Sequence, residues 1–439
     1  MPGSAREVAL LALSACEKQG AWSDGYLKKT IREAGLDRRD AALATRLCFG
    51  VLQNKLLLDF YLAQLSRLPL GRLEERVLEC LRLGAYQILF LSRVPPSAAV
   101  NESVNLARKY AKNPRAAGMV NGILRSLLRQ KDAMNAPEDL SIRYSHPEWL
   151  VKEFSDTLLD PQQLEALLAA DNTQPPTVAQ VNTCRAAAGE VLRALEEEGV
   201  AVERHPWLED CLLLAETGSL ERLSAFQAGW FYIQDAAARL AVLAAGAEPG
   251  MEVLDACASP GGKSFAAAIA MGDRGRVLSC DIHPHKERLI RAGAERLGLH
   301  SITPMTQDGR AFRGEWEAAF DLVLADVPCS GLGIIRKKPD IRYKDPAPLA
   351  GLPEVQGAIL ENVSRYVRPG GVLLYATCTL LERENGGVVS GFLEAHPEFS
   401  LEGFTLPGPA GDCPGGMVTL WPHLHQTDGF FFAKLRRSR

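Results

Sequence analysis

Several features that would assign a function class directly are missing from this sequence. No apolar run approaches the roughly 20 residues that span a bilayer. The ten cysteines include no CxxC pair and no Cys/His cluster with the spacing of a zinc site. A disulfide framework is typical of small secreted domains, not of a chain of 439 residues. We therefore expect no membrane span and no metal site, and a reduced protein in the cytoplasm.

The apolar stretch near the N-terminus, residues 8–16, has few of the features of a targeting signal. Its end, residues 13–16 (LSAC), has the form of a lipoprotein cleavage site. However, the stretch is short, and the one basic residue before it, Arg6, is followed at once by Glu7. We expect an amphipathic first helix here.

A large net charge is also missing, because 49 Lys and Arg face 53 Asp and Glu, which excludes a basic polyelectrolyte. The charge is unevenly spread: residues 1–140 hold 21 basic and 14 acidic residues, and the remainder holds 28 and 39. Between residues 102 and 131, only Glu102 opposes the basic residues Arg108, Lys109, Lys112, Arg115, Arg125, Arg129 and Lys131. Such a block is either a solvated helix face or a polyanion-binding surface. Charge alone leaves both readings open.

Hydrophobic patterning divides the chain into three parts. Residues 1–140 are predicted to be all-α, because apolar residues recur at helical spacing, for instance along residues 73–89. Residues 141–235 predict a small α+β module with the order strand, helix, strand. Residues 236–439 alternate short β-rich runs with helices, which is typical of a parallel α/β sheet.

The carboxyl ends of the strands in that sheet are the candidate binding site, because ligands lie there in such folds. The expected strands are residues 252–255, 276–281, 302–307, 322–326, 371–376 and 429–435. The first four end at or near an acidic residue, namely Asp255, Asp281, Asp308 and Asp326. Each alone is also typical of a turn or a helix cap. Four in register suggest a nucleoside cofactor without phosphates.

The loop after the first strand reads DACASPGGK over residues 255–263. A glycine turn after a strand lets a ligand approach the backbone and often leads into a helix N-terminus. A phosphate loop is excluded, because Cys257 stands where that motif requires glycine, and the GxGxxG fingerprint is absent. The turn alone is weak evidence for any one ligand.

Two cysteines follow the fourth and fifth strands, Cys329 and Cys378. Neighbouring parallel strands lie about 4.8 Å apart, so the two thiols meet if these strands are adjacent. Two cysteines at strand ends beside Asp326 favour thiolate chemistry. Six other cysteines are predicted to fill the core: Cys16, Cys48, Cys80, Cys184, Cys211 and Cys280.

Three segments resemble the motifs of the RNA cytosine-C5 methyltransferases, the Sun/Nol1/Nop2 superfamily: residues 255–263, 320–331 and 375–380. The second, FDLVLADVPCSG, is the longest and most specific match. Ser259 is one small departure, since alanine is commoner there. Further support comes from Glu382, Asn385 and residues 427–431 (TDGFF).

The resemblance extends over nearly the whole chain, which is similar to the bacterial Fmu/Sun-type 16S rRNA methyltransferases, with residues 145–150 (SHPEWL) at the junction. It implies an all-α NusB-like RNA-binding domain at residues 1–140 and a small α+β linker or RNA-binding module at residues 141–235. It further implies a Rossmann-like α/β class I methyltransferase domain at residues 236–439.

The activity that the resemblance implies is transfer of a methyl group from S-adenosylmethionine to C5 of a cytosine in 16S rRNA. Cys378 would attack C6, Cys329 would help to remove the C5 proton and release the product, and Asp326 would bind the base. The residues alone do not order the two thiols. The reverse assignment stays open, because the DNA cytosine methyltransferases use a Pro-Cys nucleophile.

The same resemblance implies the cofactor site. Asp281 would bind the ribose, Asp308 the adenine amine, and the loop backbone the amino-acid part, while Lys263 would alternatively orient catalytic groups. The full set is Cys257, Ala258, Ser259, Pro260, Gly261, Gly262, Lys263, Asp281, Asp308 and Asp326. No metal is required, because the leaving group is already a sulfonium.

The expected partner is 16S rRNA. The protein is expected to be a monomer and to bind no membrane. The triplet Arg336-Lys337-Lys338 would hold RNA phosphates, or else form a solvated loop. Two alternatives stay open: the same reaction on tRNA, and a non-catalytic RNA-binding or antitermination factor. Intact Cys329, Cys378 and Asp326 argue against the second.

Overall fold

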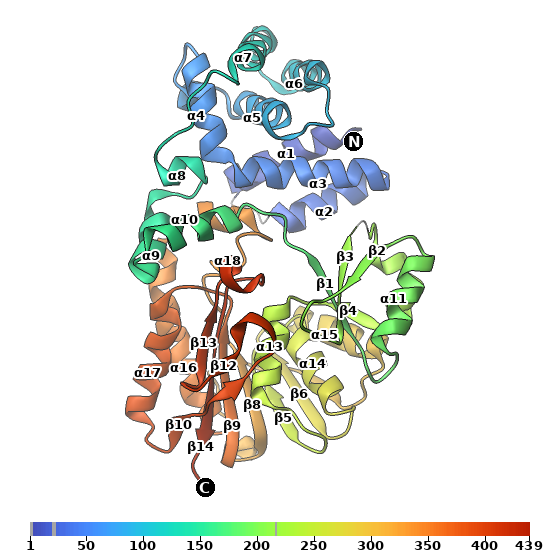
Figure 1. The fold of residues 1–439 in the computed structure, drawn as a ribbon, viewed down its shortest axis with the longest axis vertical. Coiled ribbons are helices and arrows are strands. Elements are labelled where there is room, and N and C mark those ends of the chain that lie inside the picture. Colours follow the sequence, from blue (N-terminus) through green and yellow to red (C-terminus); the bar gives the residue numbers. More distant parts are fainter. Residues whose placement is uncertain (1–2, 20–22, 216) are drawn as a thin grey trace. The chain divides into compact units, whose positions relative to one another are not determined.

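The computed structural model in Figure 1 describes residues 3–19, 23–215 and 217–439. Its contacts group the chain into two compact units. Unit 1 comprises Met1–Thr173 and Ile335–Lys344, and unit 2 comprises Gln174–Ile334 and Asp345–Arg439. The boundaries expected at residues 140 and 235 stay a prediction, since compactness alone does not define a domain. Among the described residues, no helix combines the length and apolarity that crossing a membrane requires.

The first 173 residues of unit 1 are helical where they are regular, which confirms the all-α prediction. The α-helices are α1 (Ala5–Gln19), α2 (Ser23–Ala34), α3 (Arg38–Gln53), α4 (Lys55–Leu65), α5 (Glu75–Phe90), α6 (Pro96–Tyr110), α7 (Ala116–Gln130), α8 (Leu140–Arg143), α9 (Glu148–Leu158) and α10 (Pro161–Ala170). Helix α5 is buried along most of its length and contacts α1, α3, α4, α6 and α7. It is therefore the central helix of this bundle.

A short segment from far along the chain, residues 335–344, packs into the same unit. Arg342 is fully buried there, and its guanidinium donates to the carbonyl oxygen of Ser145 at 3.1 Å and to Asn172 Oδ1 at 2.9 Å. Asp340 accepts from Ser23 Oγ at 2.6 Å. Residue 145 lies in the predicted junction, so that junction receives the inserted segment.

The small module of unit 2 is a four-stranded antiparallel sheet, with strand order β2-β3-β1-β4. Its elements are β1 (Thr177–Val181), α11 (Ala188–Glu197), β2 (Ala201–Arg204), β3 (Cys211–Ala215), α12 (Ser224–Gln227) and β4 (Phe231–Ile233). The expected order of strand, helix and strand is present. The sequence did not predict β4, because three residues are too few to show an alternation of apolar and polar positions.

The large sheet of unit 2 has the order β10-β14-β9-β8-β5-β6-β7, with β13 paired to β14. Its strands are β5 (Glu252–Asp255), β6 (Arg276–Asp281), β7 (Ile302–Thr306), β8 (Phe320–Asp326), β9 (Val367–Thr377), β10 (Phe399–Leu401), β13 (Met417–Leu420) and β14 (Phe430–Arg437). Strands β5 to β9 are parallel, and β14 runs antiparallel to β9. This is the mixed α/β sheet that the β-rich runs predicted.

Helices cover both faces of this sheet (Figure 1). They are α13 (Ala236–Ala245), α14 (Gly262–Ala270), α15 (Pro284–Leu297), α16 (Leu352–Ser364) and α17 (Gly386–Ala395); the short α18 (Pro422–His425) and the pair β11 (Phe404–Thr405) and β12 (Asp412–Cys413) lie near the C-terminus. Alternating strand residues serve the two faces: Val253 packs with α13, α14 and α15, and Leu254 packs with α16 and α17. Helix α16 ends at Ser364, shortly before β9 begins at Val367.

The strand order reverses between β5 and β8, since β6 and β7 follow on one side and β9 on the other. In open α/β sheets the ligand lies at such a switch point, outside the carboxyl ends of the strands. The ends of β5 and β8 are Asp255 and Asp326, so the fold places the predicted motifs at this point.

Candidate active site

The adjacent strands β8 and β9 bring Cys329 and Cys378 together, as expected if these strands were neighbours. Their register pairs Asp326 with Ala376, two residues before Cys378. The two Sγ atoms lie 3.0 Å apart, and the backbone N–H of Cys378 donates to Cys329 Sγ over 3.2 Å. The two thiols are therefore in direct contact.

The surroundings of Cys329 shift the pKa of its thiol. The hydrogen bond with Cys378 is the main cause that raises the pKa of Cys329 well above its usual range. Burial and the charges of Cys378, Glu384 and Asp326 act in the same direction. The neutral thiol of Cys329 is thus favoured, and either sulfur can be the donor in the contact between the two cysteines.

Lys263 forms an ion pair with Asp326, which precedes Cys329 by three residues and pairs in register with Ala376, two residues before Cys378. Lys263 Nζ lies 2.6 Å from Asp326 Oδ2 and 4.8 Å from the ring centroid of Phe430. The lysine side chain is 8% exposed and the aspartate 28%. Of the two roles expected for Lys263, its contact in this structure fits the one that orients a catalytic group.

Asp255 differs from the other three strand-end carboxylates. It is fully buried and accepts from Ser264 Oγ at 2.7 Å, and Ser279 Oγ donates in turn to Ser264 Oγ at 2.8 Å. Burial raises the pKa of Asp255 to about 7. This carboxyl therefore links β5 to α14 and, through Ser264, to β6.

The loop between β5 and α14 is held close to neighbouring strands. The backbone N–H of Ala258 donates to the Cys280 carbonyl at 2.7 Å, and the Ser259–Pro260 peptide is cis. Gly261 has a φ of 112°, which favours glycine, and a Cβ there would lie 2.5 Å from the Phe265 ring. These contacts explain why the loop needs small residues before the helix begins.

Asp281 and Asp308 lie at the ends of the next two strands. Asp281 is buried, accepts from the His283 backbone N–H at 3.0 Å and lies 3.5 Å from Lys286 Nζ. The side chain of Arg310, 2.8 Å away at Oδ2, lowers the pKa of Asp308.

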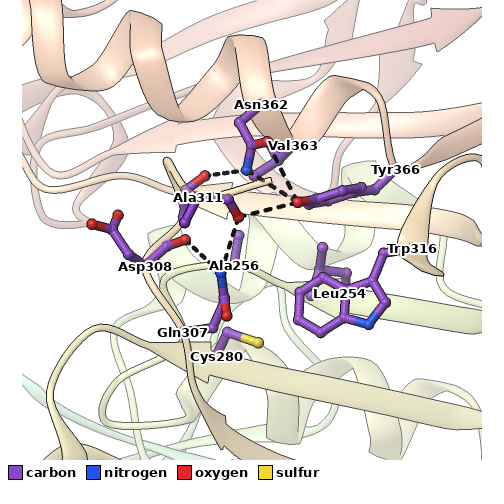
Figure 2. Close-up of a pocket in the computed structure, with 11 residues that line it drawn as sticks. Leu254, Ala256, Cys280, Gln307, Asp308, Ala311, Trp316, Asn362, Val363 and Tyr366 are labelled. Atoms are coloured by element: carbon purple, nitrogen blue, oxygen red, sulfur yellow. Dashed lines mark hydrogen bonds between the residues drawn. The ribbon is translucent and has the colours of Figure 1, made fainter. Parts of the chain in front are cut away.

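A small pocket lies beside Asp308 (Figure 2). Its lining includes the apolar residues Leu254, Ala256, Val363 and Trp316, with Gln307 and Asp308 as polar groups. The hydroxyl of Tyr366 accepts from Asn362 Nδ2 at 3.2 Å, and Asn362 Nδ2 also donates to the Gly309 carbonyl at 2.7 Å. The pocket is therefore mostly apolar, and the Asp308 carboxylate points away from it, toward its ion pair with Arg310 (Figure 2).

Sequence reasoning missed two buried residues of the site, Glu384 and Gln356. Glu384 Oε2 accepts the backbone N–H of Ser330 at 2.9 Å and Gln356 Nε2 at 2.8 Å. Glu384 lies between Glu382, which is exposed, and Asn385, which is buried, and only these two residues were singled out there. Nothing in the sequence of this turn distinguishes the buried glutamate from the exposed one.

Several other expectations depend on exposure. Of the basic block, Arg108, Lys109, Lys112, Arg115, Arg125 and Arg129 are exposed on and between α6 and α7. Arg336 is buried, so within the predicted phosphate-holding triplet only Lys338 is exposed.

Cys184 is exposed and Cys16 is half-buried, so the prediction of core filling is wrong for Cys184. In the described part of the chain, no group of three or more His, Cys, Asp or Glu could hold a metal ion.

Three family models match this chain. The model described as 16S rRNA methyltransferase RsmB/F matches residues 242–436, the NusB family matches residues 3–129, and the Methyltr_RsmF/B-like, ferredoxin-like domain matches residues 146–221. The three matches follow one another in the order that the resemblance implied.

Similar proteins agree with these matches. The probable ribosomal RNA small subunit methyltransferase B of Bacillus subtilis is 37% identical over 99% of both chains. The corresponding protein of Klebsiella pneumoniae is 33% identical over 91% of both chains.

Solved structures show the same fold. The crystal structure of PH0851 is 25% identical, with a TM-score of 0.82 over 100% of this chain and 99% of that one. NSun6 from Pyrococcus horikoshii with SFG, an analogue of S-adenosylmethionine, is 20% identical, with a TM-score of 0.58 over 67% of this chain and 98% of that one. On the full-length identity to its relatives, this chain belongs to the RsmB/F family of 16S rRNA methyltransferases.

Proposed function

We propose that this enzyme transfers a methyl group from S-adenosylmethionine to C5 of a cytosine in 16S rRNA through a covalent adduct on Cys378. The observation that carries the proposal is the direct contact of the Cys329 and Cys378 thiols at 3.0 Å, beside the ion pair of Lys263 and Asp326. Family membership supports the substrate class.

Cys378 is the nucleophile in this proposal. C5 of cytosine is a weak nucleophile, and addition of a thiolate to C6 makes C5 enamine-like. The S–H of Cys329 stabilises the Cys378 thiolate before attack, because the raised pKa of Cys329 keeps its own proton in place. Asp326, held by Lys263, hydrogen-bonds the base and stabilises the charge that develops on it.

Release of the product requires a base, and we assign this role to the second thiol, Cys329. Once C5 carries both its proton and the new methyl group, Cys329 first gives up its own proton to solvent and, as thiolate, takes the C5 proton. The electron pair of the C5–H bond then forms the C5–C6 double bond, and the C6–S bond to Cys378 breaks. A thiol with a raised pKa is a strong base once its own proton has left, which fits this role.

The described residues fit S-adenosylmethionine, which supplies an electrophilic methyl group on a sulfonium. The apolar lining of the small pocket beside Asp308 would contact the edge of the adenine ring, and the Asp308 carboxylate, which is paired with Arg310 in this structure, would accept from the exocyclic amine. Asp281 at the neighbouring strand end is an acceptor for ribose hydroxyls. The loop at residues 257–263 would hold the amino-acid part.

The basic surface of α6 and α7 supports contact with RNA. Its exposed members include Arg108, Lys112, Arg115 and Arg125. Such side chains bind phosphates without reading sequence. We propose that this surface adds a second grip on rRNA, apart from the reacting base.

The test is transfer of labelled methyl from S-adenosylmethionine to purified, unmodified 16S rRNA, with tRNA and small ribosomal subunits assayed in parallel. The proposal expects label in the rRNA, as 5-methylcytosine. Label in tRNA alone would contradict the substrate class. Absence of label from all three substrates would favour a non-catalytic RNA-binding protein.

A further inference from the structure

The backbone on both sides of Cys329 is held by one pair of buried side chains. On one side, Gln356 Nε2 donates to the Pro328 carbonyl at 3.0 Å. On the other side, the Ser330 N–H donates to Glu384 Oε2 at 2.9 Å. The same Gln356 Nε2 donates to Glu384 Oε2 at 2.8 Å, so the two anchors form one unit.

Glu384 is itself held firmly. Its side chain is fully buried, and its backbone carbonyl accepts from the Tyr375 hydroxyl at 2.5 Å. Tyr375 belongs to β9, the strand that ends at Thr377, directly before Cys378. The backbone of Glu384 is therefore tied to the strand that leads to one thiol, while its carboxylate holds the loop of the other.

Fold stability alone does not explain a carboxylate at this place. Glu384 Oε1 and Gln356 Oε1 are both buried without a protein partner. A buried polar atom left without a partner costs about 1–3 kcal/mol, and a buried charge costs more. Such an arrangement is typical of a functional site, where strain or charge is retained for the reaction.

The charge of Glu384 acts on the thiol of Cys329. Glu384 is among the groups that raise the pKa of Cys329, after Cys378 and burial. The carboxylate thus acts on both the position of Cys329 and its proton.

We propose that Glu384 is the positioning residue that sets Cys329 for release of the methylated product, and that Gln356 is its second support. The inference rests on the proposed function, because it needs Cys329 to act in release. Adduct formation by Cys378 depends on this pair only through the Cys329 S–H, because their own hydrogen bonds reach the Cys329 loop and not Cys378 Sγ. Displacement of a reacting group by about 1 Å costs on the order of 100-fold in rate.

The experiment compares Glu384→Ala, Glu384→Gln and Gln356→Leu with the wild type. Each is mixed with unmodified 16S rRNA and S-adenosylmethionine, quenched in denaturant, and analysed for covalent protein–RNA adduct and for released methylated RNA. Glu382→Ala is the matched control, because Glu382 is exposed two residues away.

We expect Glu384→Ala to form the adduct within a few-fold of the wild-type rate and to release product about 100-fold more slowly, so that adduct accumulates. Gln356→Leu should show the same pattern at about tenfold, because the bond to Ser330 remains. Glu384→Gln should recover most of the release rate, since its amide oxygen still accepts both hydrogen bonds. The control should behave as the wild type does.

Four outcomes would overturn the inference. Release by folded Glu384→Ala at the rate of the control would remove the role, and equal slowing of adduct formation and release would indicate a general structural effect. Release by Glu384→Gln as slow as by Glu384→Ala would exclude positioning through hydrogen bonds. If Glu384→Ala does not fold, the absence of adduct accumulation in Gln356→Leu decides against the proposal. An inactive wild type would instead contradict the proposed function itself.

Discussion

Residues 326–334 and residues 335–344 follow one another in the chain, yet the first stretch belongs to unit 2 and the second to unit 1. Both contain a side chain surrounded by polar groups from distant parts of the sequence. In the first, Cys329 contacts the thiol of Cys378, and a buried carboxylate holds its loop. In the second, Arg342 contacts mainly neutral oxygens, including the carbonyl of Ser145. A reaction site is therefore marked by reactive partners and not by buried polar groups alone.

The two stretches also differ in what their charges imply. The second contains the triplet Arg336-Lys337-Lys338, which as a sequence has the composition of an RNA contact. The structure buries Arg336 of this triplet inside unit 1 and leaves Lys338 exposed, so only part of this basic run serves packing. The first stretch has almost no net charge, yet it carries the candidate chemistry.

The largest effect that separates the two stretches is expected at the thiols. Cys378→Ala should lower methyl transfer by about 10⁴-fold or more, because no other group of the site replaces a nucleophile. Binding of S-adenosylmethionine should stay near normal, as measured by calorimetry. Cys329→Ala should instead accumulate a denaturant-resistant protein–RNA adduct.

Cys184→Ala is the control for these variants, because this thiol is exposed and lies in the same unit. It should have wild-type activity. An inactive Cys329→Ala together with an adduct in Cys378→Ala would exchange the roles of the two thiols. That result would leave the reaction as proposed and make the Pro-Cys thiol the nucleophile.

The second effect concerns Arg342. Arg342→Met keeps the length of the side chain but removes the donors to the Ser145 carbonyl and Asn172 Oδ1, so about 3 kcal/mol of local stability should be lost. Hydrogen exchange of peptides from residues 145–173 should accelerate by on the order of 100-fold. Lys338→Met, at an exposed position of the same segment, should change exchange little. Unchanged exchange in Arg342→Met would contradict an anchoring role.

Much of the large sheet could be predicted because its signals are local. Short β-rich runs between helices predicted β5 and β6 with their observed bounds, and parallel neighbours at fixed spacing predicted that Cys329 and Cys378 meet. The resemblance then assigned their chemistry, which spacing alone could not do.

The parts that could not be predicted depend on distant partners. Ser145 and Asn172, which accept hydrogen bonds from Arg342, lie about 170 to 200 positions earlier in the chain. Nothing near Arg342 in the sequence therefore indicates that it is buried. Glu382 and Glu384 are the same residue type two positions apart, and only the turn between them decides which is buried. Asp255 closes a strand as Asp326 does, but a serine pair beneath it turns its carboxyl into a structural group.

The smallest effect compares how the two units respond to pH. Burial, assisted by the charge of Arg342, lowers the pKa of His146 to about 4. An unfolded histidine titrates near 6.5, so the folded unit binds fewer protons, and its stability falls as pH drops from about 6.5 toward 4. The titration of Asp255 changes stability with pH in the opposite direction. Its raised pKa of about 7 means that the fold favours the protonated carboxyl, and stability falls as pH rises from about 4 through 7.

Between pH 7 and pH 5, the titration of His146 should lower the free energy of unfolding of unit 1 by about 2 kcal/mol. Over the same range, the titration of Asp255 should raise that of unit 2 by about 2 kcal/mol. Hydrogen exchange at the two pH values, corrected for the intrinsic exchange rate, measures both changes in one sample. His146→Gln should remove the loss in peptides around residue 146, and Asp255→Asn should remove the gain in peptides from β5. Changes of the same sign in both units would show that buried His146 and Asp255 do not govern the response, and that the contrast between the units is not electrostatic.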